Sequence, residues 1–438
     1  MLCLLVVQSS LLTAQVAAGP MLGYSEMREV VIWVQTQKEA QIQYKYWPTD
    51  SPADVHWSEK ERTEKGHYFM KKIVLDEVLP GKKYAYELYV DKKKISFPYP
   101  LTFQTQELWQ WRKDPPSFKF AVGSCTYTNQ PEFDRPGRAY GGTYDIFNKI
   151  YDQKPDFMVW GGDNIYLREV DWNTRSGVYK RYNEFKKQKE LQPLFASAHH
   201  YAIWDDHDYG PNDADRAYWG KEWTREAFEE NWGNPNYIFP DEAVTGTFFW
   251  QDVQFFLMDD RSFKAPNGDP DPAKDYFGKK QLDWLIDALT LSNATFKVVV
   301  TGGQIVNPAV LFENMSTYPV ERDQLFDRIA EHKLSGVIFI TGDRHNTSLR
   351  KLDRPGNYPI YDLTVSPLTS GVAAARDIEK NSPDLIPGTL IEDIQTFGLI
   401  EVSGTVKERK MKINIFDNTG LKKWDFEINS AELQDSGK

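Results

Sequence analysis

Five short apolar segments in the later part of the chain end at side chains that can bind a metal ion. These side chains are Cys125 after "FAVGS", Asp163, Asn164 and Tyr166 after "FMVWGG", Asp205, Asp206, His207 and Asp208 after "YAIW", Gln304 after "KVVVTGG", and Asp343 and His345 after "GVIFITG". In α/β sheets the carboxyl ends of strands form the crevice in which ligands bind, and glycine there lets two backbones approach closely. We therefore expect the five segment ends to meet at one site.

The stretch "WDDHD" concentrates carboxylates that repel one another when they ionise together. It is therefore either a solvated acidic loop or one wall of a cation site. The other signals also have structural alternatives. A Gly-Asp pair after a strand can be a turn or a helix cap, Gln304 can be an ordinary hydrogen-bond partner, and His345 an ordinary loop residue. Taken together, the five signals favour a metal site.

The candidate ligands divide by the metal that they prefer. A thiolate and a phenolate beside carboxylates suit ferric iron, whereas carboxylates and an amide oxygen suit calcium, magnesium or manganese. We therefore predict two different metals that share Asp163. Two cations about 3.5–4 Å apart can clamp the attacking and the leaving oxygen in phosphoryl transfer.

The elements that must position these side chains have an α/β pattern. After Phe118, short apolar runs alternate with charged segments that predict helices within residues 142–153, 175–190, 224–232, 279–291 and 322–333. The late stretches "FGLIEVSG", "KMKINIFD" and "KKWDFEI" predict strands that complete a second sheet. The fold class is therefore α/β, a two-sheet sandwich flanked by helices.

Residues 19–106 have a different, all-β pattern and predict a small sandwich domain. Within it, "LPGKKYAYELYV" resembles the turn and strand of fibronectin type III domains in which a tyrosine hydroxyl is tied to nearby backbone. The proline pair in "KDPPSF" marks a linker over residues 107–117. We then predict a catalytic domain over 118–430 and a polar tail over 431–438.

The net charge of -11 over 438 residues disfavours a nucleic acid or an anionic membrane as the main partner. No apolar run beyond the N-terminus is long enough for a transmembrane segment, and we expect a monomer. The first residues, 1–18, predict a signal peptide cleaved near Ala17 or Ala18, and hence a periplasmic or secreted protein. A buried first strand is the alternative, because no Lys or Arg precedes the apolar run.

Cleavage would remove Cys3 and leave Cys125 without a disulfide partner. A free cysteine is usually a buried, inert thiol. Its alternative role is that of a thiolate held by a metal.

In their order along the chain, "GSC", "GGDNIY", "WDDHD", "TGGQ" and "TGDRH" resemble the motifs of the PhoD-type alkaline phosphatases, a branch of the metallophosphoesterase (calcineurin-like) superfamily. The resemblance covers nearly the whole chain. It implies hydrolysis of small phosphate mono- or diesters by in-line attack of a metal-bound hydroxide. It also implies ferric iron and calcium as cofactors, with manganese, magnesium or zinc as alternatives at the second site.

The resemblance further implies a role for each candidate residue. The first metal would be held by Cys125, Asp163, Tyr166 and His345, and the second by Asp163, Asp206, Gln304 and Asp343. Three more residues, Asp205, Asp208 and Asn212, would complete the second metal's ligands or hold a further calcium.

His207 would assist the departing alkoxide, and we expect its acidic neighbours to favour the imidazolium. Arg261 and Arg344 are candidate phosphate contacts, with a structural ion pair as the alternative for each. A different class of function also fits part of the pattern. A secreted, non-catalytic calcium-dependent binding or adhesion protein would explain the carboxylates, but it would not explain a thiol and a phenol at the same crevice.

Overall fold

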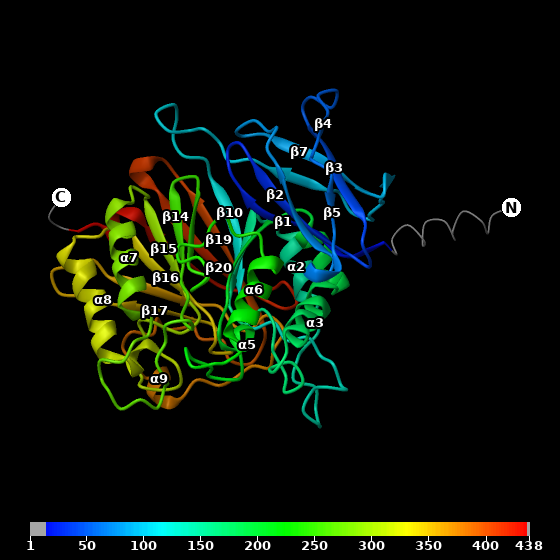
Figure 1. Cartoon of the computed structure of the whole chain (residues 1–438). Coiled ribbons are helices and arrows are strands. Elements are labelled where there is room, and N and C mark those ends of the chain that lie inside the picture. Colours follow the sequence, from blue (N-terminus) through cyan, green and yellow to red (C-terminus); the bar gives the residue numbers. More distant parts are fainter. Residues whose placement is uncertain (1–14, 436–438) are drawn as a thin grey trace.

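Two large β-sheets stack face to face, with helices on both outer sides (Figure 1). The computed structural model describes residues 15–435. The larger sheet has the strand order β21 (Lys422–Asn429), β20 (Lys410–Asp417), β19 (Thr396–Ser403), β10 (Phe118–Gly123), β11 (Phe157–Gly161), β12 (His199–Ile203), β1 (Val16–Ser25), β2 (Val30–Thr36), β6 (Met70–Leu75). The smaller has the order β13 (Gly246–Trp250), β14 (Val253–Leu257), β15 (Phe296–Val300), β16 (Val337–Thr341), β18 (Ile360–Thr364), β17 (Ser348–Leu352). The predicted two-sheet α/β class is confirmed.

The longer of the described helices lie on the two outer sides of this sandwich. They are α2 (Ile146–Asp152), α3 (Arg175–Lys186), α4 (Gln192–Phe195), α5 (Asp206–Tyr209), α6 (Lys221–Asn231), α7 (Gly278–Leu291), α8 (Pro319–Glu331) and α9 (Asp377–Lys380). Short 3-10 turns are η1 (Lys65–His67), η2 (Lys189–Leu191), η3 (Met315–Thr317), η4 (Val406–Glu408) and η5 (Ser430–Leu433). Each predicted helical segment contains a helix, although the one expected over 175–190 ends at Lys186 and continues as η2 and α4.

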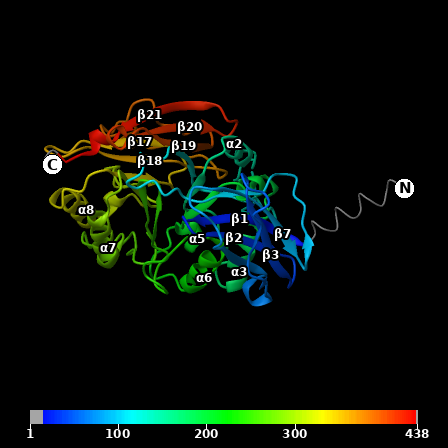
Figure 2. The same cartoon turned by 90° about the horizontal axis from the view of Figure 1, so that it is seen from above.

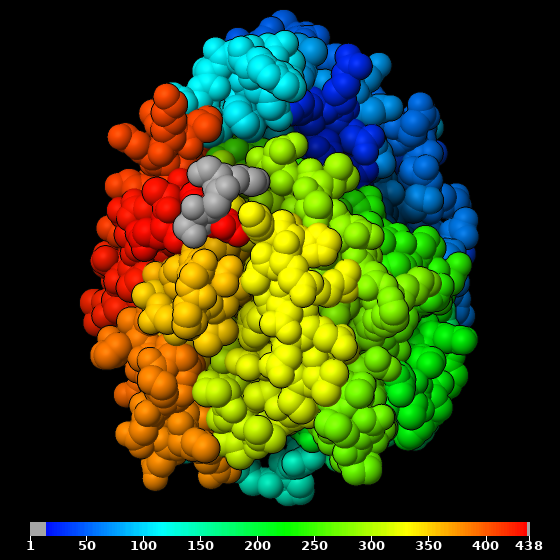
Figure 3. Space-filling model, turned by 90° about the vertical axis from the view of Figure 1, so that its left-hand side faces the viewer, coloured from blue at the N-terminus to red at the C-terminus, as the bar shows by residue number. Residues whose placement is uncertain are grey.

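Side chains at alternate positions of the central strands point to opposite faces of the sheet and form two hydrophobic cores. In β10, Phe120 and Val122 pack toward the smaller sheet, whereas Ala121 packs toward α2 and α3. Helix α7 buries Leu282, Leu285, Ile286 and Leu289, which recur at helical spacing on one face. Helices α7 and α8 lie on the side opposite the N-terminal strands (Figure 2), and Figure 3 shows them covering that face beside the C-terminal strands.

The parallel strands determine where the candidate site lies. In the larger sheet β10, β11 and β12 are parallel neighbours, and in the smaller sheet β14, β15, β16 and β18 are parallel neighbours. Most of these strands are buried along their whole length, as expected for parallel strands covered on both faces. Their carboxyl ends carry the five predicted side-chain groups.

The N-terminal strands form a sandwich that shares the larger sheet. The third sheet contains β4 (His56–Trp57), β3 (Gln41–Pro48), β7 (Lys83–Val90) and β8 (Lys93–Lys94), with β5 (Glu61–Arg62) on β3 and β9 (Thr102–Gln104) on β7. It packs against β1, β2 and β6, and β1 pairs in parallel with β12 through Leu22 and His199. The region expected as a separate domain is therefore continuous with the main sheet.

Two features of this region can be compared with expectation. The hydroxyl of Tyr84 accepts a hydrogen bond from the Leu79 amide at 2.8 Å, as the fibronectin type III resemblance implies.

Most of the predicted signal peptide lies outside the described residues. Its last residues belong to β1, where Ala18 pairs with Gln35, which favours the alternative of a first strand for Val16–Ala18. Cleavage near Ala17 stays a prediction.

The polar tail predicted over 431–438 includes residues that belong to the packed structure. Leu433 is buried, and its carbonyl accepts a hydrogen bond from the Gly336 amide at 2.9 Å. The apolar side chain of Leu433 thus places η5 in the core. Within residues 15–435, no helix has the length and apolar character needed to cross a membrane.

Candidate metal centre

The carboxyl ends of the strands approach one another closely because glycine lines the contact. The Gly342 amide, after β16, donates to the Gly302 carbonyl, after β15, at 2.7 Å. A Cβ atom on Gly302 would lie 2.2 Å from Asp205 Oδ2, and one on Gly342 would lie 2.6 Å from the Gly161 carbonyl oxygen. Any side chain at these positions would therefore separate the two sheets at the crevice.

Metal-ligating atoms cluster in this crevice. Four groups of three residues each hold ligand atoms within 4.8 Å of one another: Cys125, Asp163 and His345; Asp163, Asp206 and His207; Asp205, Asp206 and Asp343; and Asp206, Asp213 and Glu313. Asp163 links the first two groups and Asp206 links the last three. The structure thus brings together candidate residues that follow four different strands.

The backbone is strained at this cluster. Cys125, Asp163, Asp343 and His345 have φ angles of 60°, 52°, 59° and 54°, in the left-handed region that residues other than glycine rarely adopt. Such strain costs free energy and persists where the surrounding structure enforces it, commonly at functional sites. Here it turns four side chains toward one space.

The hydrogen bonds of His345 direct one ring nitrogen to the cluster. Its Nδ1 lies 2.6 Å from the Gly371 carbonyl oxygen and 3.0 Å from the Tyr140 hydroxyl. A carbonyl only accepts, so this contact assigns the proton to Nδ1. The lone pair is then on Nε2, which lies 3.1 Å from the Tyr166 hydroxyl. This is the arrangement in which an outer carbonyl orients a metal-binding histidine.

Cys125 and Tyr166 are buried beside Asp163. Cys125 Sγ lies 3.6 Å from Asp163 Oδ2 and accepts a hydrogen bond from Ser366 Oγ at 3.1 Å. Burial raises the pKa of the Cys125 thiol to about 11, and Asp343 adds to the rise. Burial, followed by the charge of Asp163, raises the pKa of Tyr166 well above its usual value. Both groups would need a bound cation to lose their protons.

The carboxylates show that a cation fits this crevice. Burial, followed by the neighbouring Asp206, raises the pKa of Asp163 well above its usual value. Burial also acts upward on Asp206, but the charges of His207 and Arg261 outweigh it, so that its pKa falls to about 2. Asp206 Oδ1 and Asp205 Oδ2 are buried without a hydrogen-bond partner in the described chain. A metal ion would satisfy these oxygens.

Arg261 lies beneath the crevice, which corrects its predicted role as a phosphate contact. Its side chain is fully buried, ion-paired with Asp205 and, through Nη1 at 2.8 Å, with Glu313. Lys264 also pairs with Glu313. The alternative of a structural ion pair therefore holds. The same pairing leaves Asp205 only one oxygen for a cation.

The structure also corrects the roles of other candidates. Asp208 is buried and accepts from the backbone amides of Asn164, Ile165 and Asp205 at 3.0–3.2 Å, so it caps α5 and holds the loop rather than facing a metal. Because Asp205, Asp206 and Asp208 are all buried, the solvated-loop alternative for this stretch is wrong. Asn212 is exposed at the rim.

Gln304 and Arg344 are held by structural partners. The Gln304 amide nitrogen donates to Thr364 Oγ1 at 2.7 Å, and its oxygen accepts from Asn307 at 2.7 Å. These contacts favour the alternative of a structural hydrogen-bonding residue. Arg344 pairs with Glu379 at 2.9 Å, as in the ion-pair alternative.

His207 lies at the boundary between the cluster and an open cavity of about 450 Å³. Its ring packs on Tyr166, with centroids 4.1 Å apart, and its amide donates to Asp163 Oδ1 at 3.2 Å. Burial lowers the pKa of His207 even though Asp206 raises it. This shift runs against the expected preference for the imidazolium, because desolvation outweighs the neighbouring carboxylates.

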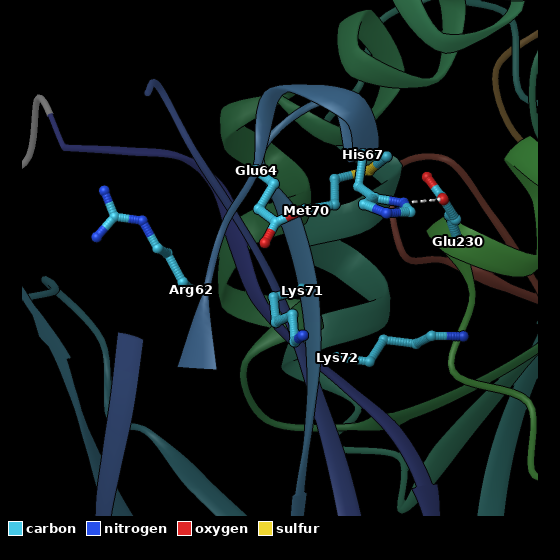
Figure 4. Close-up of a pocket in the computed structure, with 7 residues that line it drawn as sticks. All are labelled: Arg62, Glu64, His67, Met70, Lys71, Lys72 and Glu230. Atoms are coloured by element: carbon cyan, nitrogen blue, oxygen red, sulfur yellow. Dashed lines mark hydrogen bonds and ion pairs between the residues drawn. The ribbon is translucent and has the colours of Figure 1, made fainter. Parts of the chain in front are cut away.

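A second hollow, of about 290 Å³, lies between β6 and α6 and lacks these features (Figure 4). Several of its charged groups are paired with carboxylates or with nearby backbone. His67 Nδ1 lies 2.6 Å from Glu230 Oε1, Lys71 pairs with Glu61 at 2.7 Å, and Lys72 donates to the Glu229 carbonyl at 2.7 Å. The strand-end crevice is therefore the better candidate for chemistry.

Sequence reasoning missed three residues that lie at the site: Asp213, Glu313 and Ser366. Ser366, which contacts Cys125 Sγ and the His345 amide, follows the apolar run of β18, so the same strand-end signal could have identified it. Glu313 lies in an irregular segment, without a preceding strand or motif. Only the fold brings it to Arg261 and Asp206.

Comparisons with known proteins identify the family of the chain. The sequence profile of the family "PhoD-like phosphatase" matches residues 120–413, and that of "Domain of unknown function (DUF7800)" matches residues 13–108. The chain belongs to the PhoD-like phosphatase family and is a phosphoesterase hydrolase. This membership favours an enzyme over the non-catalytic calcium-binding alternative. No curated protein matches the chain.

Among solved structures, "Structure of PhoD" superposes with a TM-score of 0.76 at 17% identity, covering 94% of this chain and 92% of that one. This likeness establishes the fold. A Vps29 single mutant from Entamoeba histolytica covers 71% of this chain and 98% of its own at 10% identity, with a TM-score of only 0.26.

Proposed function

We propose that the chain hydrolyses phosphate mono- or diesters at the strand-end crevice, with two metal ions that share Asp163. The observation that carries the proposal is the overlap of the ligand groups, in which Asp163 and Asp206 each belong to more than one. Cys125, Asp163, Tyr166 and His345 would hold ferric iron. Asp163, Asp206 and Asp343 would hold calcium or another divalent ion.

When bound, the two cations would supply Lewis-acid chemistry: they would lower the pKa of a coordinated water and neutralise charge on the phosphoryl oxygens. The protein's own contribution is to fix the ligands. Ser366 contacts the Cys125 sulfur at 3.1 Å, and the Gly371 carbonyl orients the His345 ring at 2.6 Å. These outer contacts keep the sulfur and the imidazole Nε2 aimed at one position.

His207 is the group placed to hold or deliver a proton to the leaving oxygen. Its ring faces the cavity beside Tyr166. Burial lowers the pKa of this ring, and Asp206 acts in the opposite direction. A phosphate anion bound in the crevice would add negative charge beside it and so favour the imidazolium, which can protonate the departing alkoxide. His207 thus becomes an acid when substrate is present.

The test combines metal analysis, visible absorption and turnover of a panel of mono- and diesters. A phenolate bound to ferric iron gives a visible charge-transfer band, whereas calcium gives none. Tyr166→Phe should remove the phenolate band and leave only the absorption of a thiolate on iron. The matched control is Tyr127→Phe, whose ring lies 5.1 Å away and whose hydroxyl donates to Asp134 at 2.9 Å; it should stay coloured. A colourless, iron-free wild-type protein that hydrolyses esters would refute the iron assignment, and a metal-loaded protein without ester turnover would refute the activity.

A further inference from the structure

The 450 Å³ cavity adjoins the candidate metal centre on the side of Tyr166 and His207. Its outer wall is formed by residues of the segment 127–140, and further walls come from 166–172 together with Pro211 and Asn212. The segment 127–140 runs along the lower edge of the molecule in Figure 1. Because Tyr166 and His207 line both spaces, the group attached to a phosphorus atom in the crevice would enter this cavity.

Internal contacts hold the outer wall in place. The Arg168 guanidinium is buried and donates to Asp134 Oδ1 at 2.9 Å and to the Thr128 carbonyl at 2.8 Å. It also lies over the Tyr127 ring, 4.0 Å from the centroid. The Tyr127 hydroxyl donates to the same Asp134 oxygen at 2.9 Å. Asp134 and Arg168 therefore neutralise each other within the wall.

Two other arginines on this wall have free guanidinium groups. Arg135 and Arg138 are exposed, and within residues 15–435 neither side chain forms an ion pair or a hydrogen bond. The remaining carboxylate of the lining, Glu169, is also exposed. In a chain of net charge -11, a pair of free cations beside the cavity creates a local attraction for anions.

Aromatic rings form the rest of the lining. Phe133 and Tyr140 are each 46% exposed, and Trp172 lies partly exposed on the opposite segment. Partly exposed rings offer flat surfaces for stacking against a planar group. The cavity therefore combines two recognition elements, an aromatic surface and a cationic edge.

We propose that this cavity binds the leaving group of the substrate and selects esters whose leaving group carries an aromatic ring and a second anionic group, which Arg135 and Arg138 contact. The proposal rests on the proposed function. It goes further in naming the chemical class of substrate: an aryl-type or heterocyclic alcohol that carries an additional negative charge.

The test uses a pair of esters, 4-ethylphenyl phosphate and 4-(2-sulfoethyl)phenyl phosphate, because their phenols have nearly equal acidity and differ mainly in charge. We expect the wild-type kcat/KM to favour the sulfonate by about tenfold at low salt and less at high salt. Arg135→Gln combined with Arg138→Gln should bring the ratio close to one, through a loss of kcat/KM that is much larger for the sulfonate than for 4-ethylphenyl phosphate. The matched control, Lys38→Gln with Lys60→Gln, removes the same charge from exposed positions in the N-terminal region and should keep the ratio.

Binding of the free phenols gives a readout that does not depend on turnover. By ligand-observed NMR, 4-(2-sulfoethyl)phenol should bind the wild type more tightly than 4-ethylphenol, and the double arginine variant should lose the difference. Equal binding of the two phenols, a ratio near one in the wild type, or equal loss of activity on both esters in the variant would overturn the substrate class. Tight sulfonate binding without hydrolysis of either ester would instead refute the proposed activity and leave the subsite standing.

Discussion

Two of the regions that bury ionisable side chains do so in opposite ways. In the strand-end crevice, Asp206 has a carboxylate oxygen within 4.8 Å of one from Asp163 and of one from Asp205. Between the N-terminal strands and α3, by contrast, a single ammonium group, that of Lys186, is fully buried. Its Nζ lies 3.4 Å from the centroid of the Trp232 ring and 3.2 Å from Met21 Sδ.

The difference shows that burial of a charge does not by itself mark a functional site. Burial lowers the pKa of Lys186 well below its usual value, just as burial raises the pKa of Asp163 in the crevice well above its usual value. Yet aromatic rings surround Lys186. In the crevice, by contrast, Asp206 Oδ1 and Asp205 Oδ2 have no hydrogen-bond partner in the described chain, and the backbone is strained at Asp163. Like charges that converge, together with strain and unsatisfied oxygens, indicate a bound cation.

The change with the largest expected effect is Asp163→Asn. The amide has nearly the same size but lacks the charge that two cations would share, so both metals should be lost together. Activity should fall by more than the roughly 10–100-fold typical of an outer-sphere partner. Metal analysis and kcat/KM on an aryl phosphate measure the two effects. Retention of one metal at full occupancy would show that the two sites do not share this residue.

Cys125→Ser tests the thiolate. A serine hydroxyl is a poor ligand for ferric iron compared with a thiolate, so iron content and activity should both fall substantially while the domain stays folded. Ser366→Ala is the matched comparison, because it removes only the hydroxyl that contacts the sulfur; it should cost about 10–100-fold or less. Full iron and full turnover in Cys125→Ser would assign Cys125 to the buried, inert thiols.

His207→Ala should keep both metals and lower kcat by roughly 10²–10⁴-fold, the range for a lost general acid or oxyanion donor. The loss should shrink for aryl esters, whose leaving groups need little protonation. Equal slowing of alkyl and aryl esters would exclude the acid role. Loss of a metal would instead make His207 a ligand, as its place in one of the four groups allows.

The sequence predicts the crevice better than it predicts the role of each residue in it. Strand ends follow from apolar runs and glycines, so the convergence of Cys125, Asp163 and His345 could be expected. Whether a carboxylate faces a metal or a backbone amide depends on the direction in which the folded loop points it, which composition does not encode. Asp206 and Asp208 are two residues apart, and one is left with a free oxygen while the other caps a helix.

The same limit applies to long-range partners. Nothing near Arg261 in the chain predicts its ion pair with Glu313, because the two residues meet only after β14 and the loop beyond β15 are in place. The N-terminal sandwich shows the limit at the level of domains. Alternation predicted its strands, but the edge-to-edge pairing of β1 with β12 carries no local sequence signal.

The change with the smallest expected effect is Lys186→Met, which tests the other side of the comparison. Methionine has a similar shape and makes favourable contacts with aromatic rings, so it should raise the free energy of unfolding by about 1 kcal/mol or more near neutral pH and leave kcat/KM unchanged. Burial lowers the pKa of Lys186 below 10.5, so the wild type takes up a proton on unfolding at pH values between the folded and the unfolded pKa. Wild-type stability should therefore rise with pH across that interval, and the advantage of the variant should shrink. Denaturant titrations from pH 7 to pH 10 measure this change in the free energy of unfolding. The control is Lys180→Met, which replaces an exposed lysine of the same helix. It should shift the free energy of unfolding by less than about 0.5 kcal/mol, with no such slope. If Lys186→Met destabilises the protein, the contacts of the Lys186 ammonium with the surrounding rings stabilise the folded state by more than its desolvation costs. The two regions would then differ only in degree.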